Sequence, residues 1–180
     1  MGSSLSELVV RRATLREAPV VAGLWTDFLG EAAELDDRLR LNADAAKRWR
    51  ADYPEWLQDT TRVFSVAALG NQIVGFVSGH LWGPEPVFED CMEIFVEYLY
   101  VLPSFRRKGI GGEMVRHVVD WGASLGATRV RIKTPARSEG ALQFWRSSGA
   151  EPAAVELTFE IESSKPVRRK QPIGFRGNSR

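Results

Sequence analysis

The sequence predicts one α/β domain built on a mixed sheet, and two observations carry that prediction. Residues 62–69 and 72–82 are rich in the branched and apolar residues that favour strands. Gly70-Asn71 between them is a two-residue hairpin signal, so the two strands should be antiparallel. Further on, residues 93–134 have the order strand, helix, strand, which favours a parallel and right-handed crossover.

The first third of the chain should supply a strand and two helices. The strand is expected at residues 8–15, with Val9 in its apolar centre. The helices are expected at residues 18–29 and 42–57, because apolar residues recur there three or four positions apart, and Asn42 can cap the second. The recurring residues are Val21, Leu24, Trp25, Phe28, Ala45, Ala46, Trp49, Tyr53 and Trp56.

The second half begins with a break at Gly83-Pro84-Glu85-Pro86, after which a strand at residues 90–101 ends at Pro103. A helix at residues 109–125 follows, with Gly126 as its C-terminal cap. Its apolar side is formed by Ile110, Met114, Val118, Trp121 and Leu125. The remaining elements are a strand at residues 127–134, a helix at 139–147 and a last strand at 153–161.

Composition favours an ordinary globular protein with one domain at residues 1–162. Apolar residues make up 44% of the chain and charged residues 26%, and no apolar run is long enough to span a membrane. We expect a cytoplasmic protein without a membrane partner, because no secretory signal is present and Cys91 is the one cysteine. One cysteine and two histidines also make a metal site unexpected.

Residues 163–180 form a basic tail that we expect to be extended and flexible. Six cations and no acid lie in its last sixteen residues, together with two prolines and two glycines. A contact with nucleic acid or with a ligand phosphate is the functional alternative, but a solvated tail is the simpler interpretation. Nucleic acid is therefore not an expected partner.

The glycine-rich segment Arg106–Gly112 lies between a strand and a helix, where backbone N–H groups converge at a helix N-terminus. Such a turn forms a cradle for an anion, most often a phosphate. It is not a Walker A loop, because no Lys-Ser or Lys-Thr follows the last glycine. It is not a Rossmann fingerprint either, because Met114 occupies the third glycine position.

The segment instead fits the pattern Arg-x-x-Gly-x-Gly within EYLYVLPSFRRKGIGGEMVRHVVDWGASLGATRVRIKTPARSEGALQFWRSSGAEP. In this run the chain resembles the Gcn5-related N-acetyltransferases (GNAT). The resemblance implies a mixed, largely antiparallel sheet of six to seven strands, flanked by about four helices and splayed between its fourth and fifth strands. It also implies acetyl-CoA as co-substrate and no metal. A homodimer is possible on this fold.

The resemblance places CoA on two neighbouring segments. The diphosphate should bind the residues of the glycine-rich segment, namely Arg106, Arg107, Lys108, Gly109, Ile110, Gly111 and Gly112. The pantetheine arm should pair with Leu99, Tyr100 and Val101, where the strand bulges away from its neighbour. The backbone N–H of Leu99 would then polarise the thioester carbonyl.

Acetyl transfer needs a group that takes a proton from the amine, and two carboxylates are candidates. Strand periodicity places Glu93, Phe95, Glu97 and Leu99 on one face. Glu97 is the first candidate for the catalytic base and Glu93 the second. Apolar neighbours are expected to raise the pKa of such a carboxylate, although either could be a solvated glutamate on an open face.

The chain departs from the family pattern where many members have Asn, then Ala, then Tyr. Here these positions hold Ser138, Ala141 and Trp145. An indole N–H is no acid, so Trp145 should pack against the pantetheine arm or fill the core, and the thiolate should take its proton from water. Ser138 is expected to keep a polar contact to CoA.

The sequence thus predicts an N-acetyltransferase that acts on a primary amine of a small molecule or protein. An acidic cluster between the first two helices could attract the amine or merely be solvated: Glu31, Glu34, Asp36 and Asp37. His80 and His117 are interpreted as structural or exposed. The alternatives are a non-catalytic acyl-CoA-binding regulatory module and an enzyme for longer acyl groups.

Overall fold

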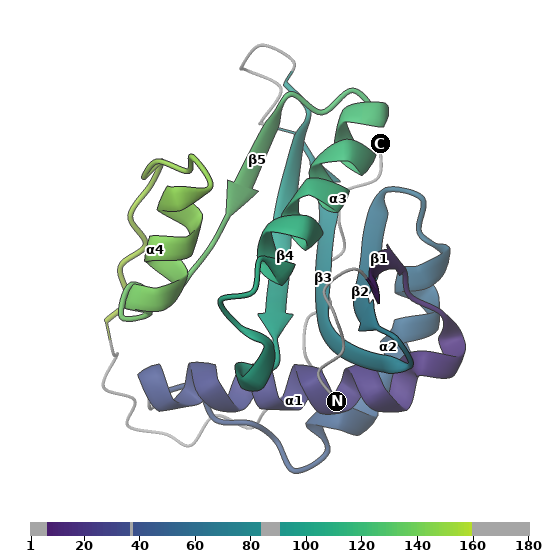
Figure 1. Ribbon diagram of the computed structural model, residues 1–180. Helices are drawn as coiled ribbons and strands as arrows, with labels where there is room; N and C mark the ends of the chain where they lie inside the picture. Colours follow the sequence, from purple (N-terminus) through teal and green to yellow (C-terminus); the bar gives the residue numbers. More distant parts are fainter. Residues whose placement is uncertain (1–6, 37, 84–90, 160–180) are drawn as a thin grey trace. The chain divides into compact units, whose positions relative to one another are not determined.

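The computed structural model describes residues 7–36, 38–83 and 91–159 (Figure 1). The chain divides into two compact units, residues 1–149 and 150–180. Residues 150–159 form no helix or strand, so the strand expected at 153–161 is absent over its described part. Alternating apolar residues predict which side of a strand would be buried, but not which sheet edge would accept it. The basic tail, residues 163–180, lies outside the described residues.

The first unit contains most of the expected elements, with shifted ends. The strands are β1 (Leu8–Arg12), β2 (Arg62–Leu69), β3 (Gln72–Trp82), β4 (Glu93–Val101) and β5 (Arg129–Ile132). The α-helices are α1 (Ala18–Leu35), α2 (Ala45–Gln58), α3 (Ile110–Ser124) and α4 (Glu139–Ser147). The first strand ends early because Glu17 accepts hydrogen bonds from the backbone and hydroxyl of Thr14, at 2.7 and 3.0 Å, which closes a 3₁₀ turn.

The described strands form one five-stranded sheet in the order β1-β2-β3-β4-β5. The first four strands are antiparallel, and β5 is parallel to β4. This confirms the predicted mixed, largely antiparallel sheet with four helices. The expected six or seven strands exceed the number found, because the sixth predicted strand is not formed in the described residues.

Two irregularities of β4 shape the sheet. Ser78 pairs with Tyr98 and Gly79 with Val96, so Glu97 is an extra residue in a β-bulge. The ladder between β4 and β5 also ends at Val96, and the two strands diverge beyond it (Figure 1). The predicted splay between the fourth and fifth strands is therefore present, and among the described residues it leaves one edge of β4 without a strand partner from Glu97 onward.

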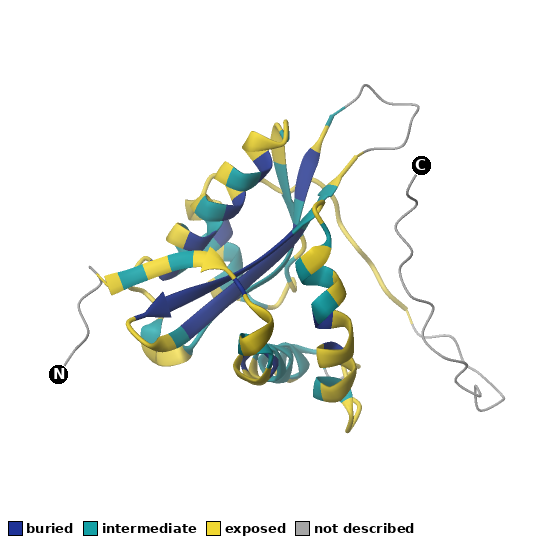
Figure 2. Cartoon of the chain, turned by 90° about the vertical axis from the view of Figure 1, so that its right-hand side faces the viewer, coloured by how far each residue is buried: buried dark blue, intermediate teal, exposed yellow. Residues whose placement is uncertain are grey.

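Helices cover both faces of the sheet. Helices α1 and α2 enclose an aromatic core in which Trp49 stacks on Tyr53 at 4.7 Å and Phe64 on Phe76 at 5.7 Å. Helix α3 covers the opposite face with the predicted residues Ile110, Met114 and Val118, each at most 1% exposed. Figure 2 shows the resulting band of buried residues along the central strands. The sheet is thus a rigid base for the loop that connects β4 to α3.

Candidate functional site

The loop from β4 to α3 has the backbone conformation of an anion-binding turn. Arg107 and Gly109 are both left-handed, with φ of 61° and 81°. The first backbone hydrogen bond of α3 runs from Glu113 N–H to the carbonyl of Gly109, at 3.1 Å, so the preceding N–H groups have no acceptor within the helix. Left-handed residues followed by a helix N-terminus point successive N–H groups into one concavity. The loop is therefore suited to a diphosphate.

The side chain of Arg106 is committed to the protein rather than to this concavity. Its guanidinium donates to the carbonyl of Val101 at 2.8 Å and to both carboxylate oxygens of Glu31 at 2.6 and 2.8 Å. It also lies over the ring of Tyr100, whose hydroxyl donates to Glu31 at 3.1 Å. Burial and then the charge of Glu31 raise the pKa of Tyr100 to about 12. These contacts fix the loop to α1 and leave Arg107 as an exposed cation beside the cradle.

Gly111 is the point at which the loop, β4 and α4 meet. A Cβ atom there would lie 3.1 and 3.2 Å from the ring of Phe144 and 4.0 Å from a methyl group of Leu99. Trp145 is 8% exposed and packs edge-to-face on Phe144 at 4.9 Å. Ser138 precedes α4 without a side-chain cap and is half-buried. Sequence patterns singled out Trp145 but missed Phe144, which makes the contact with the loop.

His117, on α3, packs against the sheet through a polar contact. His117 Nε2 is 3.0 Å from the hydroxyl of buried Ser65, and burial lowers the pKa of the imidazole. The adjoining hollow of about 420 Å³ is lined by Leu8, Val10, Lys108, Gly109, Glu113, Arg116, His117 and Asp120. Its lining mixes both signs of charge, so we assign it no ligand.

The prediction that Glu93, Phe95, Glu97 and Leu99 share one face is wrong for Leu99, and the bulge is the reason. Tyr98, which follows Glu97, packs edge-to-face on Phe28 of α1 at 5.6 Å. Leu99 instead reaches Gly111 at the start of α3, on the opposite face. An inserted residue reverses the side-chain alternation that a regular strand would keep.

Glu93 is a structural anion. It is 1% exposed, accepts from Arg129 at 2.8 Å and from Arg131 at 2.6 Å, and Arg131 in turn lies over the ring of Trp82. The hydrogen bond from Arg131 is the main cause that lowers the pKa of Glu93, against the opposing effect of burial. The predicted raised pKa is wrong here, because the sequence does not show which cations will face a carboxylate.

We expect Glu93→Gln to lower the free energy of unfolding by about 2 kcal/mol at pH 7, since it removes charge-assisted hydrogen bonds at a buried site.

The effect should depend on pH. The pKa of Glu93 is lower in the folded than in the unfolded protein, so the stabilisation that Glu93 provides is present above the ordinary value of 4.5 and is lost as the pH falls through the folded pKa. Urea unfolding from pH 7 to 3 should show the two proteins converging as the pH falls below 4.5. Glu113→Gln, at an exposed pair with Arg116, is the control and should cost no more than about 0.5 kcal/mol. A constant difference across this pH range would contradict the assignment.

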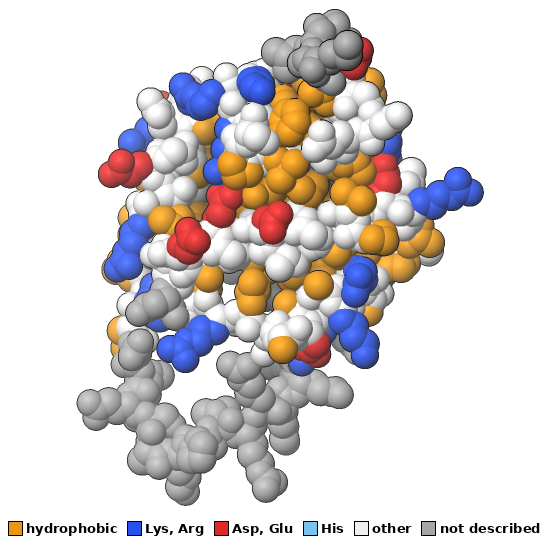
Figure 3. All heavy atoms as spheres, turned by 60° about the horizontal axis from the view of Figure 1, so that its bottom comes forward, with side chains coloured by type: hydrophobic (Ala, Val, Ile, Leu, Met, Phe, Trp, Pro, Cys, Tyr) orange, Lys and Arg blue, Asp and Glu red, His pale blue; other side chains and the backbone are white. Residues whose placement is uncertain are grey.

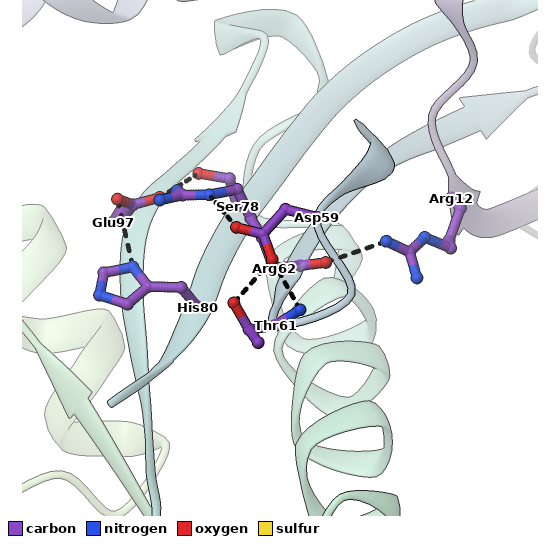
Figure 4. A network of polar contacts seen from close by, with 7 residues as sticks. All are labelled: Arg12, Asp59, Thr61, Arg62, Ser78, His80 and Glu97. Carbon is purple, nitrogen blue, oxygen red and sulfur yellow. Dashed lines mark hydrogen bonds and ion pairs between the residues drawn. The ribbon is translucent and has the colours of Figure 1, made fainter. Parts of the chain in front are cut away.

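Glu97, the inserted residue of the bulge, lies at the centre of a polar network (Figure 4). One carboxylate oxygen accepts from Arg62 and, at 3.3 Å, from Ser78, while the other lies 3.2 Å from Nδ1 of His80. Burial raises the pKa of Glu97, but the contacts with His80 and Arg62 outweigh it, so the pKa is lowered. The raised pKa predicted for this residue is also wrong.

His80 is the residue whose importance the sequence pattern did not reveal. It lies beside Phe95 of β4, with ring centroids 5.4 Å apart, and its side chain keeps 27% of its surface exposed. The sequence contained one indication of this role. Ser78 and His80 are polar, lie two residues apart and so share one face of a largely apolar strand. Their shared partner Glu97 comes from another strand, which sequence spacing does not show.

Acidic residues near the two long helices are in part engaged by cations. Glu31 binds Arg106, and the hydrogen bonds from Arg38 lower the pKa of Asp36 to about 2. Asp37 lies outside the described residues. Figure 3 shows acidic side chains near the middle of the face that carries α1, with cations around the rim. Aromatic side chains could also wall an acceptor pocket, but all except Trp82 belong to the core or pack against it: Trp25, Phe28, Trp49, Tyr53, Trp56 and Trp82.

The profile of the acetyltransferase (GNAT) family matches residues 26–150. The chain belongs to this family. No curated protein sequence matches the chain. Solved structures with the same fold include a tetramutant of the BH1408 protein from Bacillus halodurans, at a TM-score of 0.75 and 19% identity over 85% of this chain and 99% of that one.

Two aminoglycoside acetyltransferases also share the GNAT fold. AAC(6')-Iy, solved with the bisubstrate analogue CoA-S-monomethyl-acetylneamine, has a TM-score of 0.67 at 19% identity over 87% of this chain and 99% of its own. The soil metagenomic enzyme meta-AAC0020, solved with sisomicin, has a TM-score of 0.65 at 20% identity over 88% of this chain and 100% of its own. At these identities the comparisons establish the fold.

The described residues contain neither a membrane-spanning helix nor a metal-binding cluster. Among residues 7–36, 38–83 and 91–159, no helix has the length and apolar character needed to cross a membrane. Over the same residues no group of three or more His, Cys, Asp or Glu side chains is arranged to hold a metal ion.

Proposed function

We propose that this protein is an N-acetyltransferase that moves the acetyl group of acetyl-CoA to a primary amine. The observation that carries the proposal is the left-handed turn at Arg107 and Gly109, which follows the part of β4 that has diverged from β5. An anion cradle and an exposed strand edge side by side fit a ligand with a diphosphate head and an amide-containing arm.

The proposed diphosphate site comprises the backbone of residues 106–112, with Arg107 and Lys108 adding positive charge. Arg106 supports the site through Glu31 rather than through direct contact. The arm would pair with the edge of β4 at Leu99, Tyr100 and Val101, and the N–H of Leu99 would stabilise the developing oxyanion. Trp145, with Phe144, would close the opposite side of the opening, and Ser138 remains a candidate contact.

The chemistry balances without a metal or redox group. The amine nitrogen attacks the thioester carbon, the C–N bond forms as the C–S bond breaks, and the amine loses one proton. The sulfur leaves as a thiolate and takes a proton from water, because Trp145 has no hydroxyl to offer. The hydroxyl of Tyr100 is bound to Glu31, and burial raises the pKa of Tyr98, so neither is a good donor.

A small cationic amine is the proposed acceptor. Acidic side chains near α1 would attract such a molecule, and the two aminoglycoside acetyltransferases with this fold were solved with small amine ligands or their analogues. A protein amine is the other class to be tested. We further propose that residues 1–162 are the catalytic domain.

The proposal predicts that the protein binds CoA and releases its thiol when acetyl-CoA and an acceptor are both present. Thiol release should be measured with spermidine, sisomicin, neamine and a lysine-containing peptide, and acetylation confirmed by mass. Turnover with a small amine and not the peptide would support the proposed acceptor class. If calorimetry shows CoA binding but no amine causes thiol release, the non-catalytic acyl-CoA-binding module is supported instead. Faster turnover with a longer acyl-CoA would replace acetyl-CoA as the proposed donor.

A further inference from the structure

We propose that His80, positioned by Glu97, accepts the proton from the attacking amine. The inference rests on the proposed acetyl transfer and names the residue that performs one of its steps. Glu97 then has a different role from the one expected from the sequence: it positions His80 instead of acting as the base. Four described side chains carry it: Arg62, Ser78, His80 and Glu97 (Figure 4).

The network lies where the pairing of β4 with β5 ends. Val96 is the last β4 residue paired with β5, and Glu97 is the next residue along the strand. His80 pairs with Phe95 on the neighbouring strand, one residue before that point. An arm that enters from the glycine-rich loop at the far end of β4 and follows its edge carries the thioester toward this point. The amine must therefore meet the carbonyl close to His80 and Glu97.

Glu97 is poorly placed to take the proton itself. One of its oxygens is occupied by Arg62 and Ser78, and the other faces His80 at 3.2 Å. The pKa of this carboxylate is lowered despite the opposing effect of burial, chiefly by its contacts with His80 and Arg62. A carboxylate stabilised as an anion binds a proton weakly and is a weak general base.

His80 has the geometry that Glu97 lacks. Its Nδ1 is buried and lies 3.2 Å from a carboxylate oxygen of Glu97, without the alignment of a good hydrogen bond. The other ring nitrogen, Nε2, points away from the carboxylate (Figure 4). Histidine ordinarily changes charge near neutral pH, and a carboxylate behind the ring orients it and stabilises the imidazolium. The amine proton passes to Nε2, Glu97 stays ionised, and the imidazolium then releases the proton to solvent.

The other groups that face His80 come from the neighbouring elements. Arg62 of β2 shares Glu97 with the imidazole, and Asp59, which precedes β2, adds a second negative charge. Asp59 is held by the backbone and hydroxyl of Thr61, at 2.8 and 2.7 Å. The ring of Phe95 covers one side of the imidazole. The imidazole thus has two carboxylates and one guanidinium around it.

The kinetic test compares His80→Gln, Glu97→Gln and the control His117→Gln, with acetyl-CoA and whichever of spermidine, sisomicin and neamine the wild type turns over fastest. We expect kcat/KM to fall about 100-fold in His80→Gln and at least about 10-fold in Glu97→Gln. His117→Gln should stay within about threefold. The limb of the pH profile that rises through neutral pH should disappear in His80→Gln, whereas CoA affinity should be unchanged.

The outcomes separate this inference from the proposed function. A His80→Gln enzyme with the wild-type rate and pH profile, beside an inactive Glu97→Gln enzyme, would make Glu97 the base and overturn the inference alone. A wild type that releases no thiol with any amine would overturn the proposed function, and the role of His80 with it. His80→Asn serves as a second variant if His80→Gln does not fold, as judged by circular dichroism.

A measurement without any acceptor tests the pairing itself. The chain has two histidines, so its imidazole proton resonances can be assigned with His117→Gln and recorded by NMR in the presence of CoA. In Glu97→Gln the chemical shifts of the His80 ring protons should change, because the carboxylate 3.2 Å from Nδ1 becomes a neutral amide, while those of His117 should not. Unaltered His80 chemical shifts would show that Glu97 does not act on the imidazole and would overturn the inference.

Discussion

Gly111→Asp is expected to weaken CoA binding by at least about 100-fold while the protein stays folded. The change places a carboxylate at the mouth of the cradle proposed to hold a diphosphate, and two like charges in one concavity repel by several kcal/mol. The new side chain must also displace the ring of Phe144, which a Cβ atom would approach to 3.1 Å. Isothermal calorimetry with CoA measures the loss directly.

Gly111→Ala is the matched control, because it adds the same Cβ atom without the charge. Phe144 is half-buried and has to move by only a few tenths of an ångström, so CoA affinity should fall less than about 10-fold. Equal and large losses in the two variants would mean that packing against α4, rather than charge at the cradle, controls binding. Unchanged affinity in Gly111→Asp would place the diphosphate elsewhere.

The loop was predictable from the sequence because its conformation depends on local backbone preferences. Gly109 directly before α3, with Arg107 two residues earlier, gives the left-handed turn of an N–H cradle through local conformation. The same holds for the buried side of α3 from Ile110 to Val118, whereas Leu125, predicted on the same side, follows the end of the helix and is 42% exposed. Local patterns therefore anticipated the elements that position the proposed cofactor site.

The roles of the two carboxylates were not predictable in the same way. The family resemblance implies a bulge in β4, but which residue is inserted depends on the pairing with β3, and side-chain alternation fails at that residue, Glu97. The partners that lower the pKa of Glu93 come from β5, and those of Glu97 come from β2 and β3. Such contacts join residues far apart in the chain, and a single sequence carries no direct signal for them.

Gly75→Ala should lower the free energy of unfolding by about 3 kcal/mol, a large loss for the addition of one methyl group. A Cβ atom at Gly75 would lie 2.5 Å from the carbonyl oxygen of Tyr100 and 3.4 Å from Cα of Val101. Both are backbone atoms of β4, which cannot turn aside as the end of a side chain can. The strands must separate where Gly75 pairs with Val101, so CoA affinity should fall together with stability.

Urea unfolding followed by circular dichroism tests this, with Gly23→Ala in α1 as the control. A Cβ atom at Gly23 meets nothing within 4 Å, so the same substitution should stabilise the protein by about 0.5–1 kcal/mol through helix propensity. Opposite signs for two identical chemical changes would show that close approach of β3 and β4, rather than glycine flexibility, is what Gly75 provides. If Gly75→Ala unfolds at the wild-type urea concentration, the edge of β4 that we assign to the pantetheine arm is not held by this packing.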